Sequence, residues 1–170
     1  MGVANIFRQS NSLSRRALLA TCFASTASLL AGCAHQPRPH PRTVLFVCHY
    51  GTVKSAIARE IFIRRAHERG LAINVISHGI TVEQHTSEAL RQRLATDGIN
   101  PNRVPITPLD AATLREADIV VIFDPLPPPL VRRDARDWTG MPSMNTNYDE
   151  ARAYLNPRIE ALLTELGSGR

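Results

Sequence analysis

One short segment of the chain combines a cysteine, a glycine and a lysine in an arrangement that suits phosphate chemistry. It is Cys48-His49-Tyr50-Gly51-Thr52-Val53-Lys54-Ser55, and it follows an apolar run from Thr43 to Val47. If a helix starts near Ser55, the N–H groups at its amino terminus carry partial positive charge and attract anions. The same field favours the thiolate form of a nearby cysteine, which is a nucleophile able to attack phosphorus. We therefore predict Cys48 as a nucleophile, with Gly51 allowing a sharp turn.

The segment does not match the phosphate loop of P-loop nucleotide-binding proteins. That loop has a glycine directly before its lysine and another glycine five residues before that. Val53 and Cys48 occupy these two positions here. Nucleotide hydrolysis through such a loop is therefore disfavoured.

Strand and helix patterns alternate around this segment. Buried strands are predicted at 43–47, 72–77 and 118–123, and amphipathic helices at 55–69, 86–97 and 148–166. Thr107 is expected to cap a further helix with Pro108 in its first turn, and the last helix is expected to bend or break near Pro157. The alternation predicts an α/β fold, a doubly wound, flavodoxin-like parallel sheet of about four strands with helices on both faces. Such sheets bind ligands beyond the carboxyl ends of their strands, where Cys48 is placed.

The first 32 residues have the composition of an export signal. Arg8, Arg15 and Arg16 precede an apolar core from Ala17 to Leu30, and residues 1–32 contain no acid. The arginine pair resembles a twin-arginine signal. The apolar core is too short to span a bilayer comfortably. We expect residues 1–32 to be a signal peptide.

The end of this signal resembles a bacterial lipobox, Leu30-Ala31-Gly32-Cys33. In lipoproteins of that kind the signal is cut before the cysteine, which then receives a lipid. A plain cleaved signal with an incidental Cys33 is the alternative. Prolines alternate within residues 33–42, which predicts a stiff tether before a domain over 43–170. The expected location is the bacterial cell envelope (periplasm), with a lipid anchor as the only membrane attachment.

The charge of the chain gives little support for nucleic-acid binding. The net charge is +5, but without residues 1–32 it falls to +2, because 17 basic and 15 acidic residues remain. Nineteen of the twenty basic residues are arginine, and the only lysine is Lys54. The single lysine therefore lies inside the candidate phosphate segment.

The candidate segment resembles the loop of the low-molecular-weight protein tyrosine phosphatases and of the arsenate reductases that share their fold. That loop is a cysteine, five residues, an arginine and a serine or threonine, directly after the first strand. Residues 77–79 resemble the serine-x-glycine that follows the family's second strand. Residues 117–124 resemble a later strand of the family that ends in aspartate. The resemblance covers about residues 43–166. It implies that Cys48 is the nucleophile and that Ser55 steadies its thiolate. The implied phosphate-binding residues are His49, Tyr50, Gly51, Thr52, Val53, Lys54 and Ser55.

The chain departs from the family pattern at two positions. Lys54 replaces the loop arginine. A single ammonium group on a flexible side chain therefore stands where the family has a planar guanidinium that can donate two parallel hydrogen bonds. A decayed site and a specialised loop both remain open, and the placement of the only lysine here favours specialisation. The family's proton-donating aspartate precedes a proline, whereas this chain has Met141 before Pro142.

Two aspartates are candidates for the missing proton donor. Asp124 precedes Pro125 at a strand end and is preferred, although a structural role in bonding loop amides is equally open. Asp137 is the other candidate, and it is alternatively a solvated surface charge. Trp138 and Met141 are expected in the cleft wall or the core.

The number of cysteines separates the two activities of the family. Cys22 would leave with the signal and Cys33 would carry lipid, so Cys48 would be the only free thiol. Thioredoxin-coupled arsenate reductases of this fold need further cysteines. We therefore predict a cysteine-dependent phosphatase that acts on a phosphorylated protein or small phosphomonoester through a thiophosphoryl-enzyme, without cofactor or metal. The alternatives are a non-catalytic phosphate or oxyanion-binding module, or an arsenate reductase-like protein that uses an external thiol.

Overall fold

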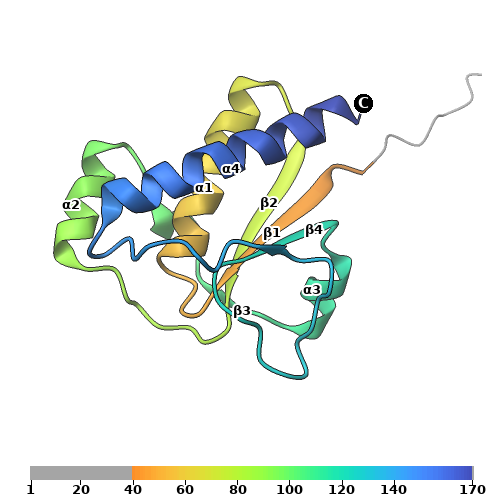
Figure 1. Ribbon diagram of the computed structural model, residues 1–170, viewed down its shortest axis with the longest axis horizontal. Helices are drawn as coiled ribbons and strands as arrows, with labels where there is room; N and C mark the ends of the chain where they lie inside the picture. The colour runs from red at the N-terminus through yellow and green to blue at the C-terminus, as the bar shows by residue number, and fades with distance from the viewer. Residues whose placement is uncertain (1–39, 170) are drawn as a thin grey trace, which may run out of the picture. The chain divides into compact units, whose positions relative to one another are not determined.

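The computed structural model describes residues 40–169, which contain a parallel β-sheet with helices on both faces (Figure 1). The five strands lie in the order β3-β2-β1-β4-β5. They are β1 (Arg42–Cys48), β2 (Ile73–Gly79), β3 (Thr107–Pro108), β4 (Ile119–Ile122) and β5 (Arg136–Asp137). The helices are α1 (Lys54–Glu68), α2 (Glu88–Thr96), α3 (Ala111–Glu116) and α4 (Tyr148–Ser168), with a short 3₁₀ turn η1 (Pro101–Arg103). The predicted signal peptide, Cys33 and most of the tether lie outside the described residues.

The predicted doubly wound α/β fold is confirmed, and the central strand is buried on both faces. Val44, Phe46 and Cys48 of β1 belong to the larger core cluster, which includes residues of α1, α2 and α4. Leu45 and Val47 alternate with them and pack into a smaller cluster with α3. None of the helices within residues 40–169 is long and apolar enough to cross a membrane.

The sheet has five strands where about four were expected, because two edge strands have only two residues each. One of these edge strands corrects the predicted helix start. Thr107 and Pro108 pair with β2 as β3 instead of opening a helix. Asp110 caps α3, and its carboxylate accepts the Thr113 N–H at 2.7 Å. An aspartate in this position satisfies an N–H group that would otherwise lack a partner.

The last helix also differs from its prediction, because α4 is one continuous helix through Pro157 and includes Gly167. Leu155 and Ile159, on either side of the proline, are completely buried in the larger core cluster. This packing supports both halves of α4 despite the hydrogen bond that a proline cannot donate.

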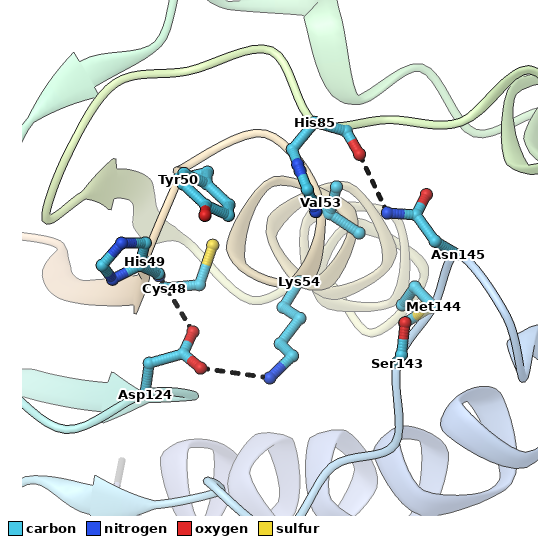
Figure 2. Close-up of a pocket in the computed structure, with 10 residues that line it drawn as sticks. All are labelled: Cys48, His49, Tyr50, Val53, Lys54, His85, Asp124, Ser143, Met144 and Asn145. Carbon is cyan, nitrogen blue, oxygen red and sulfur yellow. Dashed lines mark hydrogen bonds and ion pairs between the residues drawn. The ribbon is translucent and has the colours of Figure 1, made fainter.

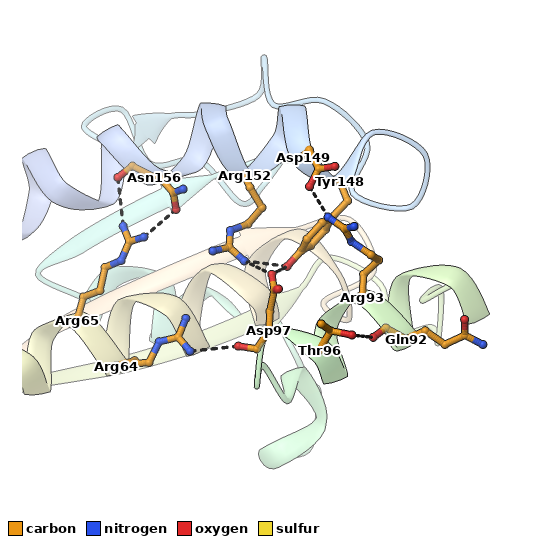
Figure 3. A network of polar contacts seen from close by, with 10 residues as sticks. All are labelled: Arg64, Arg65, Gln92, Arg93, Thr96, Asp97, Tyr148, Asp149, Arg152 and Asn156. Atoms are coloured by element: carbon orange, nitrogen blue, oxygen red, sulfur yellow. Dashed lines mark hydrogen bonds and ion pairs between the residues drawn. The ribbon is translucent and has the colours of Figure 1, made fainter.

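A polar network joins the end of α2 to the start of α4 (Figure 3). The Tyr148 hydroxyl donates to the Asp97 carboxylate, and the Arg152 guanidinium donates to it at 2.8 Å. The Tyr148 hydrogen bond is the main cause that holds the pKa of Asp97 below its usual value, and Arg152 adds to it. Burial raises the pKa of Tyr148. The network fixes the first turn of α4, which directly follows a loop that lines the candidate site.

Candidate active site

The predicted nucleophile lies where the central strand meets α1. Cys48 is the last residue of β1, and its Sγ lies 3.0 Å from the Oγ of Ser55 in the first turn of α1. Both residues are buried, and Cys48 is the only free cysteine within residues 40–169. A hydroxyl at this distance can donate a hydrogen bond to a thiolate, so the pair has the geometry that a stabilised sulfur nucleophile needs.

Two glycines allow the loop after Cys48 to lie directly against β2. Gly51 has a φ of +75°, and a Cβ added to it would lie 2.9 Å from the backbone nitrogen of Gly79. A Cβ on Gly79 would in turn lie 2.9 Å from the nitrogen of Gly51. The N–H of Ile80 donates to the Cys48 carbonyl at 3.0 Å. The loop and the Ser77-His78-Gly79 segment therefore form one packed unit.

The loop leaves the amino end of α1 open to a ligand. Val53 stands at the N-cap position and provides no side-chain hydrogen bond to the helix. Among residues 40–169, the N–H groups of residues 50–55 find no hydrogen-bond acceptor. This set of N–H groups has the polarity that binds a phosphate or a related oxyanion.

Thr52, predicted as a phosphate-binding residue, directs its side chain to a neighbouring loop. Its hydroxyl is buried, donates to the Glu83 carbonyl at 3.0 Å and accepts the His85 N–H at 3.2 Å. The Thr52 side chain therefore anchors the 83–85 segment beside the site. Only its backbone N–H remains available for an anion.

Lys54 and Asp124 form an ion pair at the carboxyl end of the sheet. The lysine Nζ lies 3.2 Å from Oδ1 of Asp124 and 3.4 Å from the Phe123 carbonyl oxygen. The other carboxylate oxygen, Oδ2, accepts the His49 N–H at 2.9 Å. Asp124 thus holds both the loop backbone and the lysine, which is the structural alternative raised above; its role as proton donor stays a prediction.

These groups surround a cavity of about 250 Å³ (Figure 2). Its lining residues are Cys48, His49, Tyr50, Val53, Lys54, His85, Asp124, Ser143, Met144 and Asn145. The sequence did not single out His85 or residues 143–145. They come from loops without hydrophobic periodicity, and the only local signal was Pro142, which immediately precedes Ser143.

Asn145 connects the two loops that carry the unpredicted residues. Its amide donates to the His85 carbonyl at 2.8 Å and accepts the Ser87 N–H at 2.9 Å. The Tyr50 ring contacts two imidazoles, with centroids 4.6 Å from His49 and 4.5 Å from His85. Three rings therefore form a rim next to the Cys48 loop.

The other predicted residues lie away from this cavity. Asp137 is exposed in β5 and accepts hydrogen bonds from the N–H and hydroxyl of Thr139, which hold its pKa below the usual range. Trp138 and Met141 are buried in the larger core cluster. Asp137 does not line the cavity, and Trp138 and Met141 are core residues.

Several solved structures share this fold. YfkJ from Bacillus subtilis has a TM-score of 0.65 and 20% identity, over 78% of this chain and 99% of its own. A mutant of the arginine phosphatase YwlE with a phosphorylated active site serine has a TM-score of 0.62 and 21% identity, over 75% of this chain and 97% of its own. An arsenate reductase in a phosphate-binding state has a TM-score of 0.58 and 20% identity, over 74% and 98%.

The family assignment rests on the sequence. Among curated proteins no sequence gives a significant match. The model of the low molecular weight phosphotyrosine protein phosphatase family matches residues 43–166, which include the sheet, the Cys48 loop and nearly all of α4. This range covers most of the chain. The chain therefore belongs to the low molecular weight phosphotyrosine protein phosphatase family.

Proposed function

We propose that this protein is a phosphatase that hydrolyses phosphomonoesters, on a phosphorylated protein or a small molecule, through a thiophosphoryl-enzyme at Cys48. The observation that carries the proposal is the 3.0 Å contact between Cys48 Sγ and Ser55 Oγ beside a cavity that Cys48 lines, where the N–H groups of residues 50–55 have no acceptor within residues 40–169. Family membership supports the same chemistry.

Each group of the loop has a part in this reaction. The Cys48 thiolate attacks phosphorus and the bond to the leaving oxygen breaks. The N–H groups of residues 50–55 and the Lys54 ammonium stabilise the charge on the three remaining oxygens. Water then attacks phosphorus, the P–S bond breaks, and inorganic phosphate leaves with Cys48 restored as the thiolate.

The purified full chain with 4-nitrophenyl phosphate tests the proposal. We expect turnover in the parent protein, and acid quenching followed by mass spectrometry should find a phosphoryl group on Cys48. Cys48→Ser should lower turnover at least about 10³-fold, because a serine hydroxyl is not ionised near neutral pH. Cys22→Ser is the matched control, since it makes the same change outside the described domain, and it should retain full activity.

Two results would contradict the proposal. Absence of turnover, together with inorganic phosphate binding that is lost in Lys54→Met, would favour a non-catalytic oxyanion-binding module. Arsenate-dependent consumption of an external thiol without phosphate-ester hydrolysis would favour a reductase.

A further inference from the structure

The cavity holds a titratable side chain to which the proposed reaction gives no role. His85 lines it from the loop between β2 and α2. Figure 2 shows this histidine on the opposite side of the cavity from the Lys54–Asp124 pair, with Cys48 between them. In an in-line displacement at phosphorus the leaving oxygen lies opposite the attacking Cys48 sulfur and therefore in the cavity, and His85 is one of the residues that line this cavity.

The reaction needs a proton at that oxygen, and the carboxylates of the chain are poorly placed to give it. The loop over residues 139–147 contains no acid, and Met141 is buried in the core. Asp137 lies outside the cavity and is committed to Thr139. Asp124 is the only carboxylate among the described residues that line the cavity. Its protonation would break the ion pair with Lys54.

His85 is held in place from two directions. Its N–H donates to the buried Thr52 hydroxyl at 3.2 Å, and its carbonyl accepts the Asn145 amide at 2.8 Å. Its imidazole packs against the Tyr50 ring, with 4.5 Å between the centroids and 35° between the planes. Neither ring nitrogen of His85 bonds to any group within residues 40–169. Both nitrogens are therefore free to exchange a proton with a bound substrate.

We propose that His85 is the general acid of this phosphatase, an inference that rests on the function proposed above. As the Cys48 thiolate forms its bond to phosphorus, the imidazolium of His85 transfers a proton to the leaving oxygen, which departs as an alcohol or phenol. The neutral imidazole then accepts a proton from the water that attacks phosphorus, and the thiolate leaves. Histidine is the side chain most often used for such transfers.

The dependence of rate on the leaving group tests this role. Protonation of the leaving oxygen speeds the reaction strongly when the departing phenolate is basic. It has little effect when the departing phenolate is already a stable anion. The test compares kcat/KM of the full chain for phenyl phosphate with kcat/KM for 2,4-dinitrophenyl phosphate. For His85→Gln we expect a loss of about 100-fold with phenyl phosphate and less than about threefold with the dinitrophenyl ester. The ratio of the two losses does not depend on the fraction of the variant that folds.

Three further variants complete the test. His67→Gln makes the same change at an exposed position of α1 and should leave both rates unchanged. His85→Asp restores an acid and should recover part of the phenyl phosphate rate. Asp124→Asn should slow both esters by a similar factor, because it disturbs the loop and Lys54 rather than the proton transfer.

The outcomes separate the inference from the proposed function. Equal losses for both esters in His85→Gln, or no loss at all, would overturn the role of His85. A selective loss with phenyl phosphate in Asp124→Asn instead of His85→Gln would assign the proton to Asp124. If the parent chain hydrolyses neither ester, the phosphatase proposal itself is wrong and the His85 proposal is wrong with it.

Discussion

At the scale of single residues, the most informative departure from the family loop is its lysine. Lys54 is the only lysine of the chain, and its ammonium is shared between Asp124 and the Phe123 carbonyl. The same Asp124 carboxylate accepts the N–H of His49, which directly follows the predicted nucleophile Cys48. Asp124 thus connects the Lys54 ammonium, the backbone of the Cys48 loop and the end of β4. A substitution of Lys54 therefore affects all three.

This arrangement predicts that Lys54→Arg does not raise the proposed phosphatase activity. A guanidinium binds a carboxylate through two parallel bonds, which would draw Asp124 Oδ2 away from the His49 N–H. Loss of that bond, worth about 1 kcal/mol, corresponds to a three- to tenfold lower kcat/KM. Lys54→Met removes the charge and should cost about 10²- to 10³-fold. Steady-state rates with 4-nitrophenyl phosphate measure both, and an arginine variant faster than the parent would show that the lysine weakens the site.

The sequence predicted the centre of the site better than its rim. Cys48, Gly51 and Ser55 were identifiable because a buried strand, a turn and a helix start occur within a few consecutive residues. His85 and Asn145 reach the cavity from separate loops, and nothing local records that Asn145 bonds to the His85 carbonyl. Thr52 was assigned to phosphate binding with its neighbours, whereas its side-chain partners are residues 83 and 85.

At the scale of elements, hydrophobic patterns were sufficient for the long strands and helices but not for the edges. β3 and β5 have two residues each, so they carry no detectable periodicity. The predicted N-cap at Thr107 failed because its backbone pairs with β2, and Asp110 caps α3 instead. Both misses depend on neighbours distant in sequence.

The contact between the Cys48 loop and β2 leads to a stability prediction. A Cβ at position 79 would press against the Thr81 carbonyl oxygen and lie 2.9 Å from the Gly51 nitrogen, so backbone would have to move. We expect Gly79→Ala to lower the free energy of unfolding by about 1 to 3 kcal/mol. Gly140→Ala is the control, because its Cβ would come no closer than 3.5 Å to a neighbour; its effect should be within about 0.5 kcal/mol. Urea denaturation compares the two, and equal stabilities would refute tight packing of the loop on β2.

The junction of α2 and α4 predicts a pH-dependent contribution to stability. The Tyr148 hydroxyl is the main group that holds the pKa of Asp97 below its usual value. Because the pKa of Asp97 is lower in the folded protein than in the unfolded chain, its ionised carboxylate stabilises the fold at pH values above the unfolded-state pKa. This stabilisation is lost as the pH falls through the folded-state pKa of Asp97. Tyr148→Phe should therefore cost about 1 kcal/mol at pH 6 and less at pH 3, as measured by urea denaturation.

Tyr154→Phe provides the matched control for this measurement, since the Tyr154 hydroxyl bonds to nothing within residues 40–169, and the Arg158 contact with its ring survives in phenylalanine. It should change stability little at either pH. If Tyr148→Phe lowers the free energy of unfolding equally at pH 6 and pH 3, the Tyr148 hydrogen bond does not lower the pKa of Asp97.

At the scale of the whole molecule, the composition of the chain changes along the sequence. Every residue that lines the cavity lies between Cys48 and Asn145, within the compact unit that starts at His40. Residues 1–32 carry three of the basic residues and no acid, which accounts for most of the net charge. The composition thus distinguishes the predicted signal peptide from a nearly neutral remainder of the chain.

This division predicts that anchoring and catalysis can be separated by one substitution. We propose that Cys33 is lipidated after export, so Cys33→Ser should abolish the mass increase of the lipid and release the protein from the membrane fraction. Its hydrolysis of 4-nitrophenyl phosphate should be unchanged, because the cavity lies wholly within the described domain. Cys22→Ser, in the predicted signal, should remain anchored. A Cys33→Ser protein that stays in the membrane fraction with an unaltered mass would refute the anchor, whereas one that loses activity would show that the tether takes part in catalysis.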